Sequence, residues 1–178
     1  MDRRVRLALA AVALVFAVLH LAALPSTLED HDSINFALGV ESFAPVKHQP
    51  HPPGYPVYIL LAKASTSTLR WVAPRWGRDR RAAVGLALWS VIAGTLGIFA
   101  LWWFWTSLGL SSSQAFLATL AGVSAPLYWF TASRPMTDMP GVFAALAVQA
   151  ALLKGMTARP TRLPHIWLWA AVGAGLAI

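Results

Sequence analysis

The sequence predicts an all-α protein, a polytopic bundle of membrane-spanning helices with a long first extracytoplasmic loop that holds interfacial helices. Of its 178 residues, 57% are hydrophobic and 12% are charged, and the mean hydropathy is +0.58. A soluble domain carries about 25% charged residues, so lipid must cover the surplus apolar surface. The nine tryptophans indicate the same class, because tryptophan gathers at membrane–water interfaces.

The net charge of +7 does not indicate a nucleic-acid partner. The 14 basic residues lie in short clusters between apolar runs, which is typical of topology signals and of contacts with lipid phosphates. We therefore expect the lipid bilayer as a partner and no nucleic acid. The chain has no cysteine, which excludes disulfides and thiolate chemistry.

Several apolar runs approach the length of about 20 residues that a helix needs to cross a bilayer. We assign residues 1–178 to one membrane domain with spans at about 5–24, 82–110, 114–132, 139–153 and 166–178. Arg3, Arg4 and Arg6 precede the first run and place the N-terminus in the cytoplasm. A cleaved signal peptide is the alternative, but no small-x-small cleavage site follows. The last run has no polar end, so we expect the N-terminal part of a longer protein.

The first loop, residues 25–81, is expected on the outer side of the membrane. Asp32 or Ser33 is a good N-cap for an interfacial helix over 34–43. The segment from residue 47 to residue 56 holds too many prolines for a helix or a central strand. A second helix is expected over 55–72.

The helix over 55–72 decides the topology, and the sequence supports two alternatives. Lys63 and Arg70 interrupt it, and a charge in mid-membrane costs about 2.5–3.5 kcal/mol, which favours an interfacial helix that does not cross. The following segment 75–81 carries four arginines, and the positive-inside rule then favours a crossing. In the crossing topology, the loop that contains Arg134 and Asp138 would face the cytoplasm.

Three of the seven acids stand close together in the first loop: Glu29, Asp30 and Asp32. Carboxylates gathered at a membrane surface suit general-base catalysis or the binding of a divalent metal. The simpler interpretation is a set of solvated loop acids, with Asp32 as a helix cap.

Two histidines, His48 and His51, follow in the same loop, and imidazole is a common metal ligand. Pro50 prevents them from lying one turn apart on a helix, so a plain loop histidine is the alternative for His48. A divalent metal is compatible with this loop, with Asp30 and His51 as its candidate ligands.

Several segments together resemble a known family. Asp32-Ser33 is followed by the turn Ala37-Leu38-Gly39-Val40 and then by the run His51-Pro52-Pro53-Gly54-Tyr55-Pro56. Residues 133–140, S-R-P-M-T-D-M-P, add a second acidic loop with an arginine four residues before an aspartate. The pattern resembles the GT-C superfamily of membrane glycosyltransferases over about residues 1–155. It is most similar to the protein O-mannosyltransferase branch, glycosyltransferase family 39.

The resemblance implies an enzyme that transfers a mannose-like sugar from a polyprenyl-phosphate donor to an acceptor. The reaction would take place on the non-cytoplasmic face, here of a bacterial inner membrane. The resemblance also implies that Asp32 is the general base, with Asp30 as the second candidate. Both acidic loops would lie outside, which favours the topology in which 55–72 does not cross.

Such a reaction needs a carboxylate to take the proton of the acceptor hydroxyl, and cations near the leaving lipid phosphate. Arginine suits phosphate because its planar fork binds two oxygens at once. The residues expected to bind the donor phosphate or the substrate are His48, His51, Tyr55, Arg78, Arg81, Arg134 and Asp138. A topology anchor is the alternative for the arginines of 75–81, and a helix cap is the alternative for Asp138.

Two other functions stay open. A transporter or flippase for a lipid-linked sugar would place ionisable residues in mid-helix or show internal repeats, and the long apolar runs show neither. A non-catalytic membrane subunit would use the acidic loop to dock a partner. Substitution of Asp32 separates these functions, because only the enzyme depends on that carboxylate.

Overall fold

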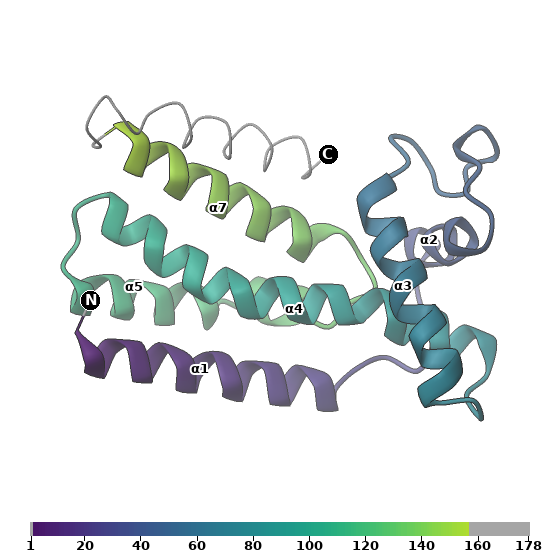
Figure 1. Ribbon diagram of the computed structural model, residues 1–178, viewed down its shortest axis with the longest axis horizontal. Helices are drawn as coiled ribbons and strands as arrows, with labels where there is room; N and C mark the ends of the chain where they lie inside the picture. The colour runs from purple at the N-terminus through teal and green to yellow at the C-terminus, as the bar shows by residue number, and fades with distance from the viewer. Residues whose placement is uncertain (1, 157–178) are drawn as a thin grey trace.

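The computed structural model describes residues 2–156, and every element in that part of the chain is a helix. The body of the molecule is a bundle of helices that lie side by side (Figure 1), namely α1 (Arg3–Ala22), α4 (Arg78–Ser107), α5 (Ser112–Val123), α6 (Pro126–Thr131) and α7 (Asp138–Met156). The remaining elements gather at one end of the bundle: α2 (His31–Glu41), the 3-10 helix η1 (Pro45–Lys47) and α3 (Pro56–Val72). We call residues 24–77, together with the loop 132–137, the cap.

Three helices in the described part of the chain are long and apolar enough to cross a membrane: α1, α4 and α7. They correspond to the predicted spans 5–24, 82–110 and 139–153, so the all-helical class and these three apolar helices are confirmed. The predicted span 166–178 lies outside the described residues. The helix α1 runs toward the cap, and α7 runs away from it. The N-terminus and Met156 therefore lie at the end opposite the cap (Figure 1).

The expected single span over 114–132 is wrong in detail, because the structure divides it into α5 and α6. Pro126 has no backbone N–H to continue the helix, and it occupies the first turn of α6 instead. The break turns Tyr128 toward α4, where its hydroxyl donates to the Gly94 carbonyl oxygen at 2.6 Å. Hydropathy does not indicate this break, because the residues on both sides of Pro126 are apolar.

The centre of the bundle is α4, whose small residues allow close packing. Phe16 of α1 is 1% exposed and lies against Gly94, where an added Cβ would come within 3.0 Å of the ring. Ile98 and Met139 lie in the same core cluster, which joins α1, α4 and α7. Helices in lipid gain no hydrophobic driving force from association, so this close van der Waals packing stabilises the bundle.

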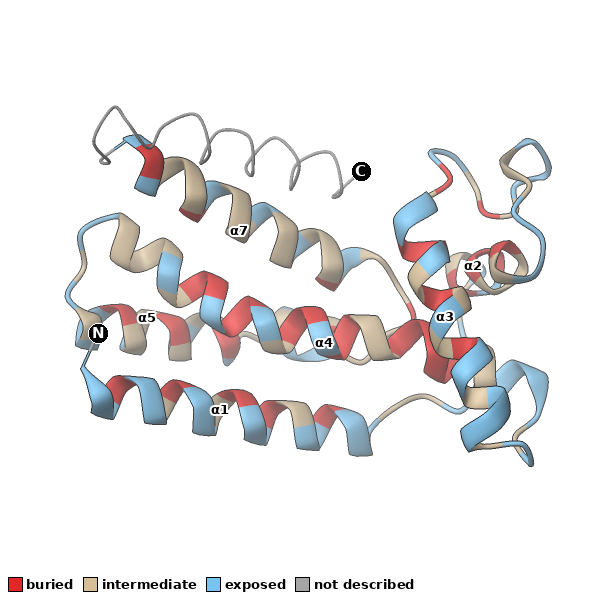
Figure 2. Cartoon of the chain, in the orientation of Figure 1, coloured by how far each residue is buried: buried red, intermediate tan, exposed pale blue. Residues whose placement is uncertain are grey.

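The helix α3 lies across the end of the bundle and packs on the first turns of α4 (Figure 1). Ser65 donates to the Gly85 carbonyl oxygen at 2.6 Å, and a Cβ at Gly85 would lie 2.5 Å from the Thr66 methyl group. Figure 2 shows the buried side of α3 turned toward α4 and its other side exposed. This arrangement places the arginines of 75–81 at the cap end, and the choice between the crossing and the non-crossing topology stays a prediction.

Candidate functional site

Asp30, rather than Asp32 or Ser33, is the N-cap of α2, which corrects the expected capping residue. Its Oδ1 accepts from the Ser33 backbone N–H at 2.7 Å, and the Ser33 hydroxyl accepts from the Asp30 N–H at 3.3 Å. This reciprocal capping box fixes the Asp30 side chain through local sequence alone. The helix therefore begins at His31, three residues earlier than predicted.

The second carboxylate oxygen of Asp30 binds the other acidic loop. Arg134 donates from Nη2 to Asp30 Oδ2 at 2.8 Å, across 104 residues of sequence, and the two side chains are 37% and 27% exposed. Ser90 of α4 holds this loop, because its hydroxyl lies 2.6 Å from the Arg134 carbonyl oxygen and 3.0 Å from that of Met136. The ion pair thus joins both acidic loops at the same end of the bundle.

Asp32 differs from Asp30 in being accessible. It stands in the first turn of α2 with 49% of its side chain exposed, and its Oδ1 lies 3.8 Å from His51 Nδ1. His51 Nδ1 is buried and has no hydrogen-bond partner among the described residues. Phe36 and Tyr55 hold the imidazole ring, with ring centroids 5.3 and 5.4 Å away. Asp32 is therefore the polar group that faces this buried nitrogen.

The proline-rich run forms a turn that sets the position of His51. The Gly54 N–H donates to the His51 carbonyl oxygen at 3.0 Å, and Gly54 and Tyr55 both have positive φ angles, of 96° and 45°. Pro56 then begins α3. His48 is exposed at the end of η1, whereas His51 packs against Phe36 and Tyr55, so the two histidines have different surroundings.

Within residues 2–156, no three His, Asp or Glu side chains come close enough together to hold a metal ion. Asp30 already binds Arg134 and the α2 backbone, which leaves its oxygens engaged. This part of the chain therefore contains no assembled set of ligands for the divalent metal that the sequence suggested, with Asp30 and His51 as candidates.

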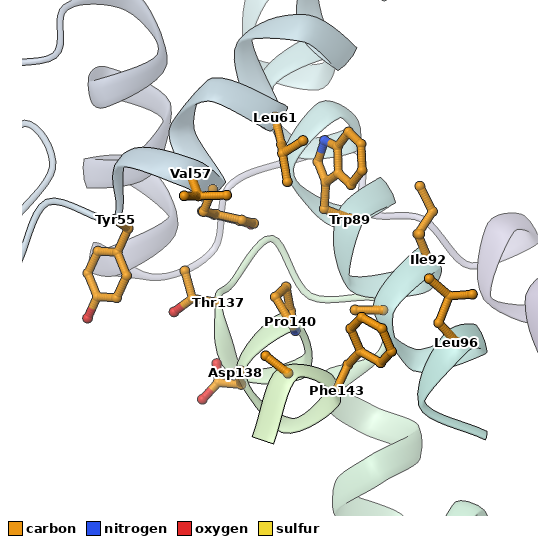
Figure 3. A pocket seen from close by; sticks show the side chains of 14 residues that line it. Tyr55, Val57, Leu61, Trp89, Ile92, Leu96, Thr137, Asp138, Pro140 and Phe143 are labelled. Atoms are coloured by element: carbon orange, nitrogen blue, oxygen red, sulfur yellow. The ribbon is translucent and has the colours of Figure 1, made fainter. Parts of the chain in front are cut away.

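A largely apolar cavity of about 440 Å³ lies between α3, α4 and α7. Figure 3 shows Leu61, Trp89, Ile92, Leu96 and Phe143 around it, with Tyr55, Thr137 and Asp138 on one side. Asp138 is exposed and is the first residue of α7. Its negative charge therefore interacts favourably with the positive, N-terminal end of the helix dipole. The two predicted substrate residues Tyr55 and Asp138 therefore line one cavity.

Tyr58 lies between this cavity and the Asp30 ion pair. Its hydroxyl donates to the Leu86 carbonyl oxygen at 3.3 Å. Burial raises the pKa of the Tyr58 phenol above its usual value, and the carboxylates of Asp138 and Asp30 raise it further. The phenol therefore stays neutral and serves as a packing and hydrogen-bonding group. Sequence reasoning did not single out Tyr58, although it stands three residues after Tyr55 on the same helix.

A second cavity, also of about 440 Å³, lies on the α1 and α6 side of the Asp30–Arg134 pair. Glu29, Ser133 and Trp129 line it together with the two members of the ion pair. His20 forms part of its wall and ties α1 to α6, because its Nε2 lies 3.0 Å from the Trp129 carbonyl oxygen. The ion pair accordingly borders a cavity with a mixed polar and apolar lining, whereas Asp138 borders a largely apolar one.

Arg78 and Arg81 contact the protein itself. Arg78 binds both carboxylate oxygens of Glu41 and thereby ties the start of α4 to the end of α2. Arg81 donates from Nη1 to the Trp76 carbonyl oxygen at 2.6 Å. These contacts favour structural roles, and phosphate binding by either arginine stays a prediction. No sequence signal connects Glu41 with Arg78, 37 residues further along.

Comparison with family models, with curated proteins and with solved structures finds no match to this chain. Its function must therefore be inferred from its own residues and their arrangement.

Proposed function

We propose that this chain forms the N-terminal part of a GT-C-type membrane glycosyltransferase, which transfers a mannose-like sugar from a polyprenyl-phosphate donor to an acceptor hydroxyl. The observation that carries the proposal is the difference between the two first-loop aspartates. Asp30 has one oxygen on the α2 backbone and the other on Arg134, whereas Asp32 is half exposed and faces only the His51 imidazole. A general base must reach the proton that it abstracts, so the role falls to Asp32.

In the proposed reaction the acceptor oxygen attacks the anomeric carbon of the donor sugar. Its proton passes to the Asp32 carboxylate, and the bond between that carbon and the lipid phosphate breaks. The phosphate leaves with the bonding electrons, so a cation nearby lowers the barrier. Arg134 supplies a partly exposed guanidinium at the site, and within residues 2–156 its other nitrogens make no hydrogen bond and can make a second contact beside Asp30.

His51 has a supporting role in this proposal. Its buried Nδ1 faces Asp32 at 3.8 Å, and a small rotation of the exposed carboxylate closes a hydrogen bond. Such a bond would fix the orientation of Asp32 while Nε2 stays directed away from it. His51 is therefore a positioning residue for the base.

The cavity between α3, α4 and α7 suits the lipid part of the donor. Its walls are largely apolar, and Tyr55, Thr137 and Asp138 supply hydroxyl and carboxylate groups that hydrogen-bond sugar hydroxyls. A polyprenyl chain requires such an apolar surface next to a polar site. In this proposal Asp138 binds the sugar and not the phosphate, because two anionic groups repel each other.

The proposed orientation places the start of α1 in the cytoplasm and the cap on the opposite face. Arg3, Arg4 and Arg6 precede the apolar part of α1 and favour the cytoplasmic side. The cap end of the molecule carries the four arginines of 75–81 together with six of the chain's seven acids: Glu29, Asp30, Asp32, Glu41, Asp79 and Asp138.

The test is Asp32→Asn in the full-length protein, reconstituted with a polyprenyl-phosphate mannose donor. Removal of a general base lowers turnover by about a hundredfold to ten-thousandfold. Donor binding and membrane insertion should stay unchanged, because Asp32 makes no side-chain hydrogen bond with any residue of 2–156. The matched control is Asp30→Asn, which keeps a good N-cap residue and loses the ion pair. Normal transfer by Asp32→Asn contradicts the assignment of the base. Absence of transfer by the wild type contradicts the enzyme and is the result that a transporter or scaffold predicts.

A further inference from the structure

The corner where α3 ends and α4 begins exposes large apolar side chains. Trp71 is 87% exposed and Val72 is 75% exposed, although both stand at the end of a helix that is otherwise packed on α4. The turn after them closes through a hydrogen bond from the Trp76 N–H to the Ala73 carbonyl oxygen at 3.1 Å. Trp at such a position is typical of the boundary between lipid and water.

A shallow hollow of about 560 Å³ lies in this corner. Its walls are Leu69, Val72, Ala73, Pro74, Arg75 and Trp76. All of these residues except Arg75 present apolar surface, so the hollow can receive the upper part of an acyl chain. Arg75 then lies beside the polar end of that chain.

The charges of the corner are arranged for an anion. Arg70 and Arg75 are exposed and have no hydrogen bond or ion pair within residues 2–156. Arg80 stacks over the Trp76 ring at 4.3 Å, which leaves its guanidinium edge free. Arg78 does not contribute, because Glu41 binds it. Asp79 is the acid of this corner, so positive charge dominates there.

We propose that this corner is a binding site for an anionic phospholipid of the bilayer. The acyl chain lies against the hollow, and the headgroup phosphate binds Arg70 and Arg75, whose planar guanidinium groups fit phosphate oxygens. A zwitterionic lipid fits less well, because its own cation meets a surface that is already positive. The bound lipid anchors the end of α3 in the headgroup layer.

This site is separate from the proposed donor site. The cavity between α3, α4 and α7 is lined from the first half of α3, whereas the hollow is lined from its last turn onward. The corner can therefore bind a phospholipid whether or not the chain belongs to a glycosyltransferase. A lipid bound there determines how the cap rests on the membrane.

Native mass spectrometry of the full-length protein tests the proposal. The purified protein is incubated with equal amounts of phosphatidylglycerol and phosphatidylcholine, and the bound lipids are counted. The wild type should retain phosphatidylglycerol preferentially. Arg70→Gln with Arg75→Gln should weaken that binding by about fivefold for each arginine removed. Both side chains are exposed, so the gel-filtration profile should not change.

The matched control is Lys47→Gln, which removes an exposed cation of the cap outside the hollow and should leave the lipid preference unchanged. Three results would overturn the proposal: no preference in the wild type, an unchanged preference in the double variant, or an equal loss in the control. Undecaprenyl phosphate is added as a competitor in a further arm. Displacement of the phosphatidylglycerol would assign the corner to the donor, whereas its retention supports a separate site.

Discussion

The bundle and the cap use different interactions. Between their first and last turns, α1, α4 and α7 contain no Asp, Glu, Lys or Arg, and small residues such as Gly94 bring the helices together. The cap is held by a capping box, by two ion pairs and by hydrogen bonds between distant residues. Changes in the bundle should therefore affect stability, and changes in the cap should affect binding and turnover while the fold persists.

The largest effect is expected in an experiment that tests whether the cap and the opposite end of the bundle lie on different sides of the membrane. Labelling of a cysteine in such an experiment is nearly all or none. The chain has no cysteine, so single cysteines can be placed at will. In intact cells, a membrane-impermeant maleimide should label Ser26→Cys and Ser133→Cys in the cap. Ser113→Cys, in the first turn of α5 at the far end of the bundle, should react only after permeabilisation. Protection of Ser133→Cys in intact cells would mean that the two acidic loops are not on one outer surface.

The next largest effect is expected in the bundle. Phe16→Ala removes a side chain that is 1% exposed and contacts His20, Tyr128 and Trp129. We expect it to lower the free energy of unfolding by about 3–5 kcal/mol. Leu14→Ala is the matched control on the same helix, because Leu14 is 65% exposed and faces away from the core. Unfolding of the full-length protein in micelles measures both, and equal losses would contradict the assigned core.

A smaller effect is expected in the cap, on turnover alone. In His51→Asn the amide nitrogen lies near the position of Nδ1, so this variant can still orient Asp32. In His51→Gln the amide reaches toward the position of Nε2 instead. We expect His51→Gln to lose about tenfold in turnover, about 1.4 kcal/mol, with an unchanged KM for the donor. His51→Asn should recover most of that loss, and the reverse order would mean that Nε2 contacts the donor.

Much of the bundle could be predicted from the sequence, because hydropathy reports directly on helices that face lipid. The spans that became α1, α4 and α7 are of this kind. The division of 114–132 was missed because apolar residues continue on both sides of Pro126. Hydropathy averages over such a run, whereas the break depends on one missing N–H group.

The sequence singles out the acidic residues and His51 through their chemistry and their resemblance to a family, and their role in a site stays a prediction. Their arrangement could be predicted only in part. The capping role of Asp30 was missed, although the spacing Asp-x-x-Ser is visible in the sequence. The pairs Asp30–Arg134 and Glu41–Arg78 join residues 104 and 37 positions apart, and only the fold brings them together.

The break between α5 and α6 has a consequence for protein engineering. Because Pro126 interrupts the helix, α6 is held to the bundle by side-chain contacts: Tyr128 to Gly94, His20 to Trp129, and Phe16 packed on Tyr128 and Trp129. The same short helix contributes Trp129 and Phe130 to the wall of the cavity beside the Asp30–Arg134 pair. The shape of that cavity can therefore be changed at the exposed Phe130, while Tyr128 and Trp129 keep α6 in contact with the long helices.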